Sequence, residues 1–117
     1  MSKTLISVGN IQECIDYVKE IEKILKRLEF IKSYIGIYVS NENMKKPVSE
    51  QIQKEDYLNY RLCNVFIPKV ERYLKEFQSV YTDETFFESR TRYLEKQYLF
   101  RTIKIFIQDM ENFYNIK

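Results

Sequence analysis

The sequence predicts an all-α protein: an elongated antiparallel three-helix bundle that forms a single domain over residues 1–117. Three observations predict this fold. Apolar side chains follow helical spacing along most of the 117 residues, the chain contains only two glycines and two prolines, and short polar segments separate three long amphipathic stretches. Helices joined by short loops pack as antiparallel neighbours. A chain of this length can bury a hydrophobic core without a metal ion or disulfide.

The first predicted helix begins near Asn10. Asn10 can act as its N-cap, and Glu13 three residues later completes a pair that resembles a capping box. The apolar positions that follow share one heptad register, broken only by Lys32: Ile11, Cys14, Val18, Ile21, Leu25, Leu28 and Ile35. A period of 3.5 residues is typical of a helix that packs along its length against another helix, as in a coiled coil.

We expect this helix to end between Gly36 and Ser40. A short strand over residues 34–39 is the alternative, but no second strand is predicted to pair with it. Residues 40–47 are the clearest predicted loop, because they combine polar residues with Pro47.

The second predicted helix begins near Ser49. Its apolar positions also share one heptad register: Ile52, Cys63, Phe66, Val70, Tyr73, Phe77 and Val80. Pro68 lies inside this register without shifting it, which favours a continuous helix kinked at Pro68. The alternative is a break, with Pro68 in the first turn of a new helix and four helices in total.

The third predicted helix follows a turn at Tyr81–Glu84 and runs to the C-terminus. Thr82, Asp83 and Thr85 can each cap it, and Thr85 with Glu88 matches a capping box. Its main apolar face is expected to contain Phe86, Tyr93, Phe100, Ile103, Ile107, Met110 and Tyr114. Two charged residues, Arg92 and Lys96, also fall on this face. Either their side chains reach solvent at the end of the bundle, or the helix does not begin where the spacing places it.

A second apolar face on this helix points to a partner. It comprises Phe87, Leu94, Tyr98 and Ile105, with a polar row of Arg90, Gln97 and Arg101 beside it. A helix that is apolar on two sides either lies deep in a core or covers a second surface. Arg and Tyr are enriched at the energetic centres of protein interfaces. The predicted partner-binding residues are therefore Phe87, Arg90, Leu94, Gln97, Tyr98, Arg101 and Ile105.

Nucleic-acid binding is the alternative use of the same segment. Basic side chains position phosphates and aromatic rings stack on unpaired bases, and both types alternate here. The residues that this alternative would use are Arg90, Arg92, Tyr93, Lys96, Arg101 and Lys104. The net charge of +2 is too small to indicate nucleic-acid binding by itself.

The composition argues against an enzyme. The chain has no histidine, which excludes Ser-His-Asp triads, Cys-His dyads and histidine-ligated metals. With Gly9 and Gly36 as its only glycines, it has no P-loop and no dinucleotide-binding turn. Cys14 and Cys63 both lie on apolar registers, where we expect buried, unreactive thiols. A disulfide would require their Cα atoms to lie within roughly 7 Å. We expect no catalytic residue, no cofactor and no metal.

These exclusions favour a non-catalytic helical module that binds another protein, as an inhibitor, immunity factor or adaptor. Long heptad registers also make a homodimer an alternative. The first ten residues lack a long apolar segment, and no run of about 18 apolar residues exists, so we expect a cytoplasmic protein without membrane contact. The bias toward Ile, Lys, Asn, Tyr and Phe, with no alanine, suggests an AT-rich genome. A phage or mobile-element protein directed at a host system would be a special case.

Overall fold

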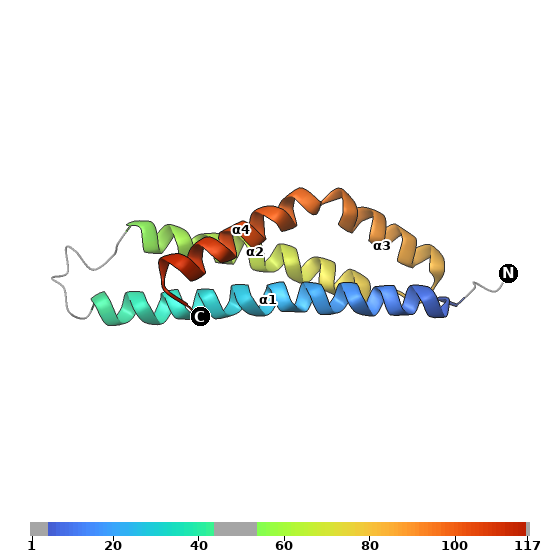
Figure 1. Ribbon diagram of the computed structural model, residues 1–117, viewed down its shortest axis with the longest axis horizontal. Coiled ribbons are helices and arrows are strands. Elements are labelled where there is room, and N and C mark those ends of the chain that lie inside the picture. The colour runs from blue at the N-terminus through green and yellow to red at the C-terminus, as the bar shows by residue number, and fades with distance from the viewer. Residues whose placement is uncertain (1–4, 44–53, 117) are drawn as a thin grey trace.

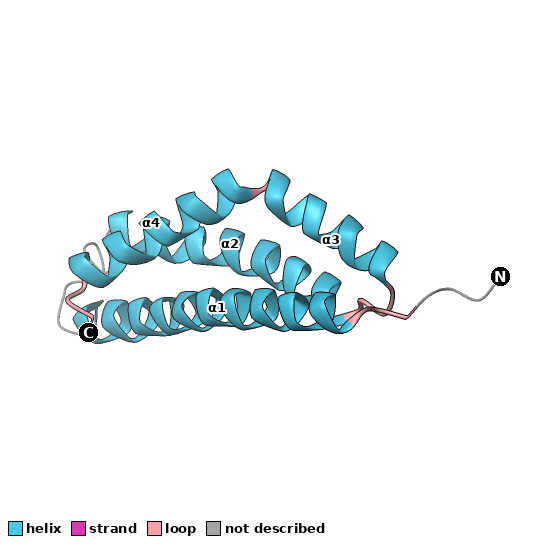
Figure 2. Ribbon diagram, turned by 45° about the vertical axis from the view of Figure 1, so that its right-hand side comes forward, coloured by secondary structure: helices cyan, strands magenta, loops and turns pink. Residues whose placement is uncertain are grey.

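Four α-helices make up the computed structural model, which describes residues 5–43 and 54–116 (Figure 1). They are α1 (Val8–Asn43), α2 (Lys54–Gln78), α3 (Asp83–Glu95) and α4 (Gln97–Phe113). The molecule is elongated, with dimensions of 68 × 24 × 20 Å. The described residues contain no strand, only an isolated bridge between Leu5 and Thr82 (Figure 2). The predicted all-α, elongated fold is therefore confirmed.

Helices α1 and α2 run antiparallel and pack along their length (Figure 1). Most of the fully buried side chains of this pair belong to the two predicted heptad registers, which place Ile21, Leu28 and Ile35 of α1 and Cys63 and Val70 of α2 in one core. Ile11, the first residue of the predicted α1 register, is instead 40% exposed, and Ile67 of α2 is buried although it lies outside the predicted register. Burying each such side chain contributes about 1.5–3 kcal/mol. Two further buried residues of α1 were not in the predicted register, Ile24 and Ile31. They lie on the side of α1 that faces α3 and α4.

Helix α1 is longer at both ends than the sequence indicates. It continues through residues 34–39, so the helical prediction is confirmed and the strand alternative is wrong. It also includes Ser40–Asn43, the first part of the predicted loop. The remainder of that loop and the predicted start of the second helix, including Ser49 and Ile52, lie outside the described residues.

The predicted N-cap of α1 is wrong. Asn10 lies inside the first turn, because the helix begins at Val8 and the Ser7 carbonyl accepts a hydrogen bond from the Ile11 N–H at 2.9 Å. The Asn10 side chain instead donates to Asp83 Oδ1 at 2.8 Å, and the Ser7 N–H donates to the same oxygen at 2.8 Å. One carboxylate thus joins the first turns of α1 and α3. These hydrogen bonds lower the pKa of Asp83 below its usual value.

Pro68 lies within α2 without ending it, so the prediction of one continuous helix is confirmed and the predicted break there is wrong. Both Pro68 and Asn64 are exposed. The Asn64 carbonyl, which loses its helical N–H donor to the proline ring, lies where water can bind it. A proline on the outer side of a helix therefore leaves the packed side of α2 intact.

The sequence predicts a single helix over the last part of the chain, but this helix is interrupted at Lys96, between α3 and α4. The backbone N–H of Lys96 donates to the Tyr93 carbonyl at 3.1 Å, and Gln97 Nε2 donates to the same oxygen at 3.2 Å. The helix restarts with the Leu99 N–H bonded to the Lys96 carbonyl at 3.0 Å. Helices α3 and α4 consequently form an arch over the α1–α2 pair (Figure 2).

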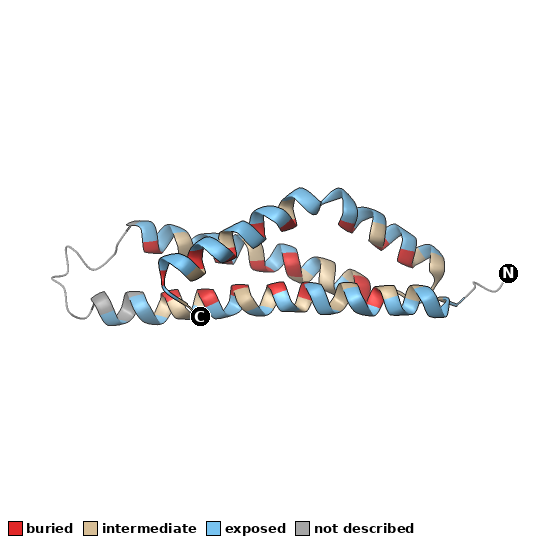
Figure 3. Ribbon diagram, viewed as in Figure 1, coloured by how far each residue is buried: buried red, intermediate tan, exposed pale blue. Residues whose placement is uncertain are grey.

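The break also bears on the two charges that fall on the predicted apolar face. Arg92 is exposed, and its Nε lies 3.3 Å from Glu76 Oε2 of α2. Lys96 is exposed at the junction itself. Neither charge is therefore placed in the core. The buried residues of α3 and α4 lie on the side of the arch that faces α1 and α2 (Figure 3).

The N-cap of α3 is Thr82, which is one of the three capping residues predicted from the sequence. Its Oγ1 accepts from the Thr85 N–H at 3.1 Å, and Thr85 Oγ1 accepts from the Thr82 N–H at 3.1 Å. The two threonines thus form a reciprocal capping box. The predicted box between Thr85 and Glu88 is wrong, because Thr85 is the third helical residue and not the cap.

The space under the arch is filled by aromatic rings from all four helices. Tyr93 is at the centre: its ring centroid lies 5.1 Å from that of Tyr17, 5.6 Å from Phe77 and 4.8 Å from Phe100. We call the following six residues the aromatic cluster: Tyr17, Tyr73, Phe77, Phe86, Tyr93 and Phe100. Offset and edge-to-face ring pairs each add about 0.5–1.5 kcal/mol beyond area burial.

We expect Tyr93→Ala to lower the free energy of unfolding by about 3 kcal/mol or more, because it removes the central ring of the aromatic cluster and leaves a cavity. Urea denaturation followed by circular dichroism measures this change. Tyr98→Ala is the matched control, because Tyr98 is 64% exposed, and its cost should be about 0.5 kcal/mol or less. Equal costs for the two substitutions would contradict the described packing.

We expect Pro68→Ala to raise the free energy of unfolding by about 2 kcal/mol. Alanine restores the helical hydrogen bond to Asn64 and removes the ring clash, and the gain exceeds the entropy that proline removes from the unfolded chain. A denaturation midpoint that stays the same or falls would argue that α2 does not run continuously through this position.

Candidate protein-interaction surface

The second apolar face predicted from the sequence is exposed. Phe87 and Leu94 of α3 are 45% and 50% exposed, and Tyr98 and Ile105 of α4 are 64% and 57% exposed. Their helices also carry fully buried residues, such as Phe100 at 1%. The second apolar face is therefore exposed and is not part of the core. We call these four exposed residues the outer apolar residues.

The bend at Lys96 divides the outer apolar residues into two pairs. Phe87 and Leu94 lie seven residues apart on α3, and Tyr98 and Ile105 lie seven residues apart on α4. Each pair therefore lies along one side of its own helix. The two pairs follow two different helix axes and do not form one straight stripe.

Cations lie against aromatic rings in both pairs. The Arg90 guanidinium lies 5.3 Å from the centroid of Phe87, and Lys96 Nζ lies 5.7 Å from that of Tyr98. Arg90 is also held by Glu13 of α1 at 3.3 Å. Such cation–π contacts contribute about 0.5–1 kcal/mol at exposed sites and orient the ring.

The two remaining predicted partner-binding residues differ in their surroundings. Gln97 is exposed, but its amide donates to the Tyr93 carbonyl and so helps form the junction between α3 and α4. Arg101 is exposed on α4 and forms no ion pair within residues 5–43 and 54–116. Arg101 is therefore the predicted residue whose charge is most available to a partner.

Most of the basic residues considered for nucleic-acid binding are engaged between helices. Three of them form ion pairs with the helices beneath the arch: Arg90–Glu13 at 3.3 Å, Arg92–Glu76 at 3.3 Å and Lys104–Glu20 at 3.1 Å. A fourth ion pair between the arch and the helices beneath it has the opposite polarity and joins Arg27 of α1 to Glu111 of α4. Tyr93 is 3% exposed inside the aromatic cluster, so its ring cannot stack on a base in this fold, and that expectation is wrong. Lys96 and Arg101 are the members of this set without a carboxylate partner in the described part of the chain.

The sequence analysis missed an apolar stripe on α2. Leu58, Leu62 and Val65 are between 40% and 49% exposed, and Phe113 of α4 is 59% exposed. The spacing of the three α2 residues at i, i+4 and i+7 is the signal that would have found them.

The cysteines are buried free thiols, as expected. Burial raises the pKa of Cys63 to about 11 and also raises the pKa of Cys14, so both remain protonated at neutral pH. The Cys14 thiol donates to the Phe77 carbonyl at 3.3 Å. No group of three His, Cys, Asp or Glu residues that could hold a metal ion occurs in the described parts of the chain.

A buried polar contact ties the end of α4 to the start of α2. The Tyr114 hydroxyl donates to the Asp56 carboxylate and accepts from Asn59 Nδ2 at 3.3 Å. Burial and the acceptor carboxylate raise the pKa of Tyr114. The contact is structural, because the phenol donor and the carboxylate acceptor satisfy each other's hydrogen-bonding groups.

Over the residues that the structure describes, no helix is both long and apolar enough to cross a membrane. Comparisons of the chain with protein-family models, with curated proteins and with solved structures found no match.

We expect the free energy of unfolding to fall as the pH rises above about 9. The unfolded chain releases the Cys63 proton near its ordinary pKa of 9.0, whereas the folded protein holds it until about 11. Burial also raises the pKa of Tyr17, Tyr73, Tyr93 and Tyr114 above 10.0, so each one adds to the loss as pH rises.

Urea denaturation at pH steps from neutral to about 11 measures this dependence. Cys14→Ser/Cys63→Ser is the control: it should remove the part of the loss that starts near pH 9 and leave the part due to the tyrosines. A free energy that stays constant across this range would contradict the burial of these groups.

Proposed function

We propose that this protein is a non-catalytic helical module that occupies a surface of another protein, as an inhibitor, immunity factor or adaptor. One observation carries the proposal: the arch exposes the outer apolar residues while the opposite sides of the same helices are completely buried. Contiguous exposed apolar patches on the surface of a monomer mark interaction sites. We expect the contact to be made in the cytoplasm, where reducing conditions keep both buried thiols free.

The arrangement of the arch supports this proposal. The aromatic cluster fixes α3 and α4 from beneath, and four ion pairs fix them at their flanks. A surface that is already ordered loses little conformational entropy on binding. Aromatic anchors beside an arginine, such as Tyr98 near Arg101, are typical of the residues that dominate interface energies.

The nucleic-acid alternative has less support. It depends on a basic, aromatic segment, but the Tyr93 ring is buried and three of its cations pair with glutamates of α1 and α2. Only Lys96 and Arg101 remain for phosphate contacts, which would give a weak dependence on salt. This alternative is therefore an outcome of the test below.

The proposal is tested by affinity capture from the lysate of a low-GC bacterium, with and without nuclease. We expect a stoichiometric protein that survives nuclease and whose capture falls at least about tenfold with the double variant Leu94→Ser/Ile105→Ser, since each residue should contribute more than about 1 kcal/mol. The matched control is Leu62→Ser/Val65→Ser, which removes two equally exposed side chains from α2.

Three outcomes would overturn the proposal. They are a capture lost with nuclease, a capture that the outer double variant leaves unchanged, and the absence of any captured protein. The first would assign the segment to nucleic acid. Circular dichroism of each variant separates loss of binding from loss of folding.

A further inference from the structure

The outward side of α4 is exposed from Tyr98 to Asn112. Five residues lie on it at intervals of three or four positions, which places them along one side of a helix. We call them the α4 stripe: Tyr98, Arg101, Ile105, Asp109 and Asn112. Their spacing reads the same in both directions from Ile105, which is 57% exposed.

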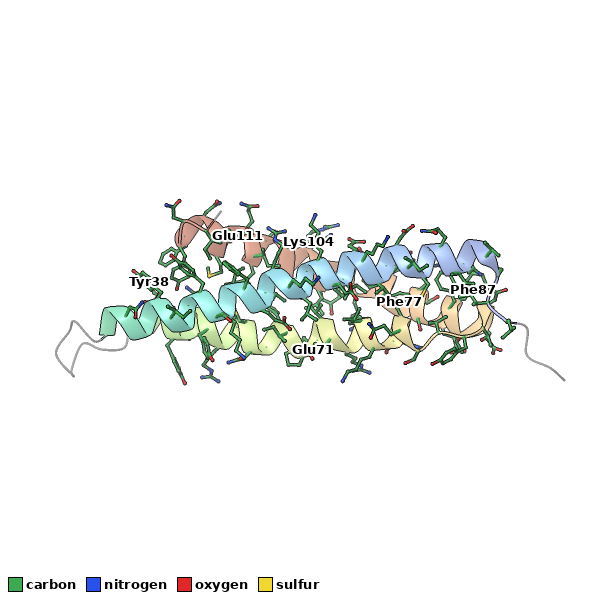
Figure 4. The ribbon with its side chains drawn as sticks, turned by 90° about the horizontal axis from the view of Figure 1, so that it is seen from below. Tyr38, Glu71, Phe77, Phe87, Lys104 and Glu111 are labelled. Carbon is green, nitrogen blue, oxygen red and sulfur yellow. The ribbon has the colours of Figure 1, made fainter. Side chains whose placement is uncertain are left out.

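The four charged residues of α4 fall into two groups. Lys104 and Glu111 lie on the flank toward α1, and each pairs with a residue of that helix (Figure 4). Arg101 and Asp109 belong to the α4 stripe, and neither forms an ion pair within residues 5–43 and 54–116. They lie four positions before and four positions after Ile105, which is about 6 Å along the axis in each direction.

This order of charges complements itself in an antiparallel helix pair. In a pair related by a two-fold axis at Ile105, each residue lies level with the residue that is equally far from Ile105 in the second copy. Arg101 then lies opposite Asp109 of the second copy, and Asp109 opposite Arg101. Packed helix axes lie about 8–10 Å apart, a separation that an arginine side chain can span.

A parallel pair of the same helices is disfavoured. It would place Arg101 against Arg101 and Asp109 against Asp109, so like charges would meet at both positions. The charges of the α4 stripe therefore select the antiparallel arrangement.

The bend at Lys96 leaves the α4 stripe accessible to a second copy. From the bend, α3 runs back toward α1 and α2, so it slopes away from the line that α4 follows (Figure 2). A second α4 can lie along the first without meeting α3.

We propose that the α4 stripe binds the same stripe of a second copy of the chain, antiparallel and about a two-fold axis at Ile105. The two Ile105 side chains meet at the axis, an Arg101–Asp109 pair lies on each side of them, and each Tyr98 lies level with Asn112 of the other copy. The apolar part of this contact is small, so we expect a weak dimer that forms at tens to hundreds of micromolar.

This inference goes beyond the proposed function. It uses α4 alone and leaves Phe87 and Leu94 of α3 exposed in each copy. A dimer would therefore present two such pairs to another protein.

Sedimentation equilibrium of the intact chain over a range of concentrations tests the inference. We expect a monomer–dimer equilibrium that shifts toward monomer as salt is raised. Arg101→Asp and Asp109→Arg should each weaken the dimer at least about tenfold, because each turns two attractive pairs into two repulsive ones.

Mixing these two variants gives the decisive result. The Arg101→Asp chain carries an acid at both positions and the Asp109→Arg chain a base at both, so the pairs are restored only between unlike chains. We expect the mixture to form a heterodimer about as strong as the unmodified dimer, and the double variant Arg101→Asp/Asp109→Arg to dimerise by itself.

Matched controls separate this contact from an effect of net charge. Lys23→Asp on the outer side of α1 and Glu88→Arg on α3 change the net charge by the same amounts at exposed positions, and both should leave the dimer unchanged. Ile105→Ser should weaken the dimer, whereas Leu94→Ser should not. Circular dichroism of each variant shows that the fold is retained.

The inference is overturned if the chain stays monomeric at every concentration, if the single charge reversals leave a dimer intact, or if the two variants do not associate when mixed. A dimer that dissociates with Leu62→Ser/Val65→Ser but not with Ile105→Ser would assign the contact to α2 and would also overturn it. Because sedimentation uses the purified chain alone, it can fail while the capture experiment succeeds, and the reverse, so the two proposals fail independently.

Discussion

The aromatic cluster beneath the arch is the interaction on which the other features of this structure depend. Tyr93 contacts rings from α1, α2 and α4, so one side chain of α3 joins all four helices. Six bulky rings need a wide space between helices, and a straight third helix packed closely against α1 and α2 would not leave it. The break at Lys96 and the separation of the outer apolar residues into two pairs both accompany this packing.

The ion pairs also distinguish the two flanks of α1. Along α1, the glutamates that face the arch pair with its cations, whereas Glu22 and Glu29 on the other flank have no such partner among the described residues. Each partly exposed pair stabilises the fold by at most about 1 kcal/mol. Their larger effect is on specificity, because they fix the register in which α3 and α4 lie over the pair beneath them.

The sequence predicted the buried side of each helix more accurately than the helix ends. The seven-residue recurrence of Phe86, Tyr93 and Phe100 identified core positions, because burial requires that spacing whatever the neighbouring helix is. The break at Lys96 involves neither proline nor glycine, and the sequence signals it only indirectly, through the two charges Arg92 and Lys96 on the predicted apolar face. For the candidate surface, periodicity identified its apolar members but could not show that Arg90 and Lys104 pair with glutamates more than seventy residues away.

Both ends of the arch are anchored. At one end Asp83 is bonded to the first turn of α1, and at the other Tyr114 is bonded to Asp56 near the start of α2. An element clamped at two points, and longer than the straight line between them, must bow outward (Figure 1). A residue inserted into or deleted from α3 or α4 would therefore change the height of the bow, with Lys96 as the place where the change is absorbed. The length of these two helices, as much as their side chains, sets the curvature of the surface that they present.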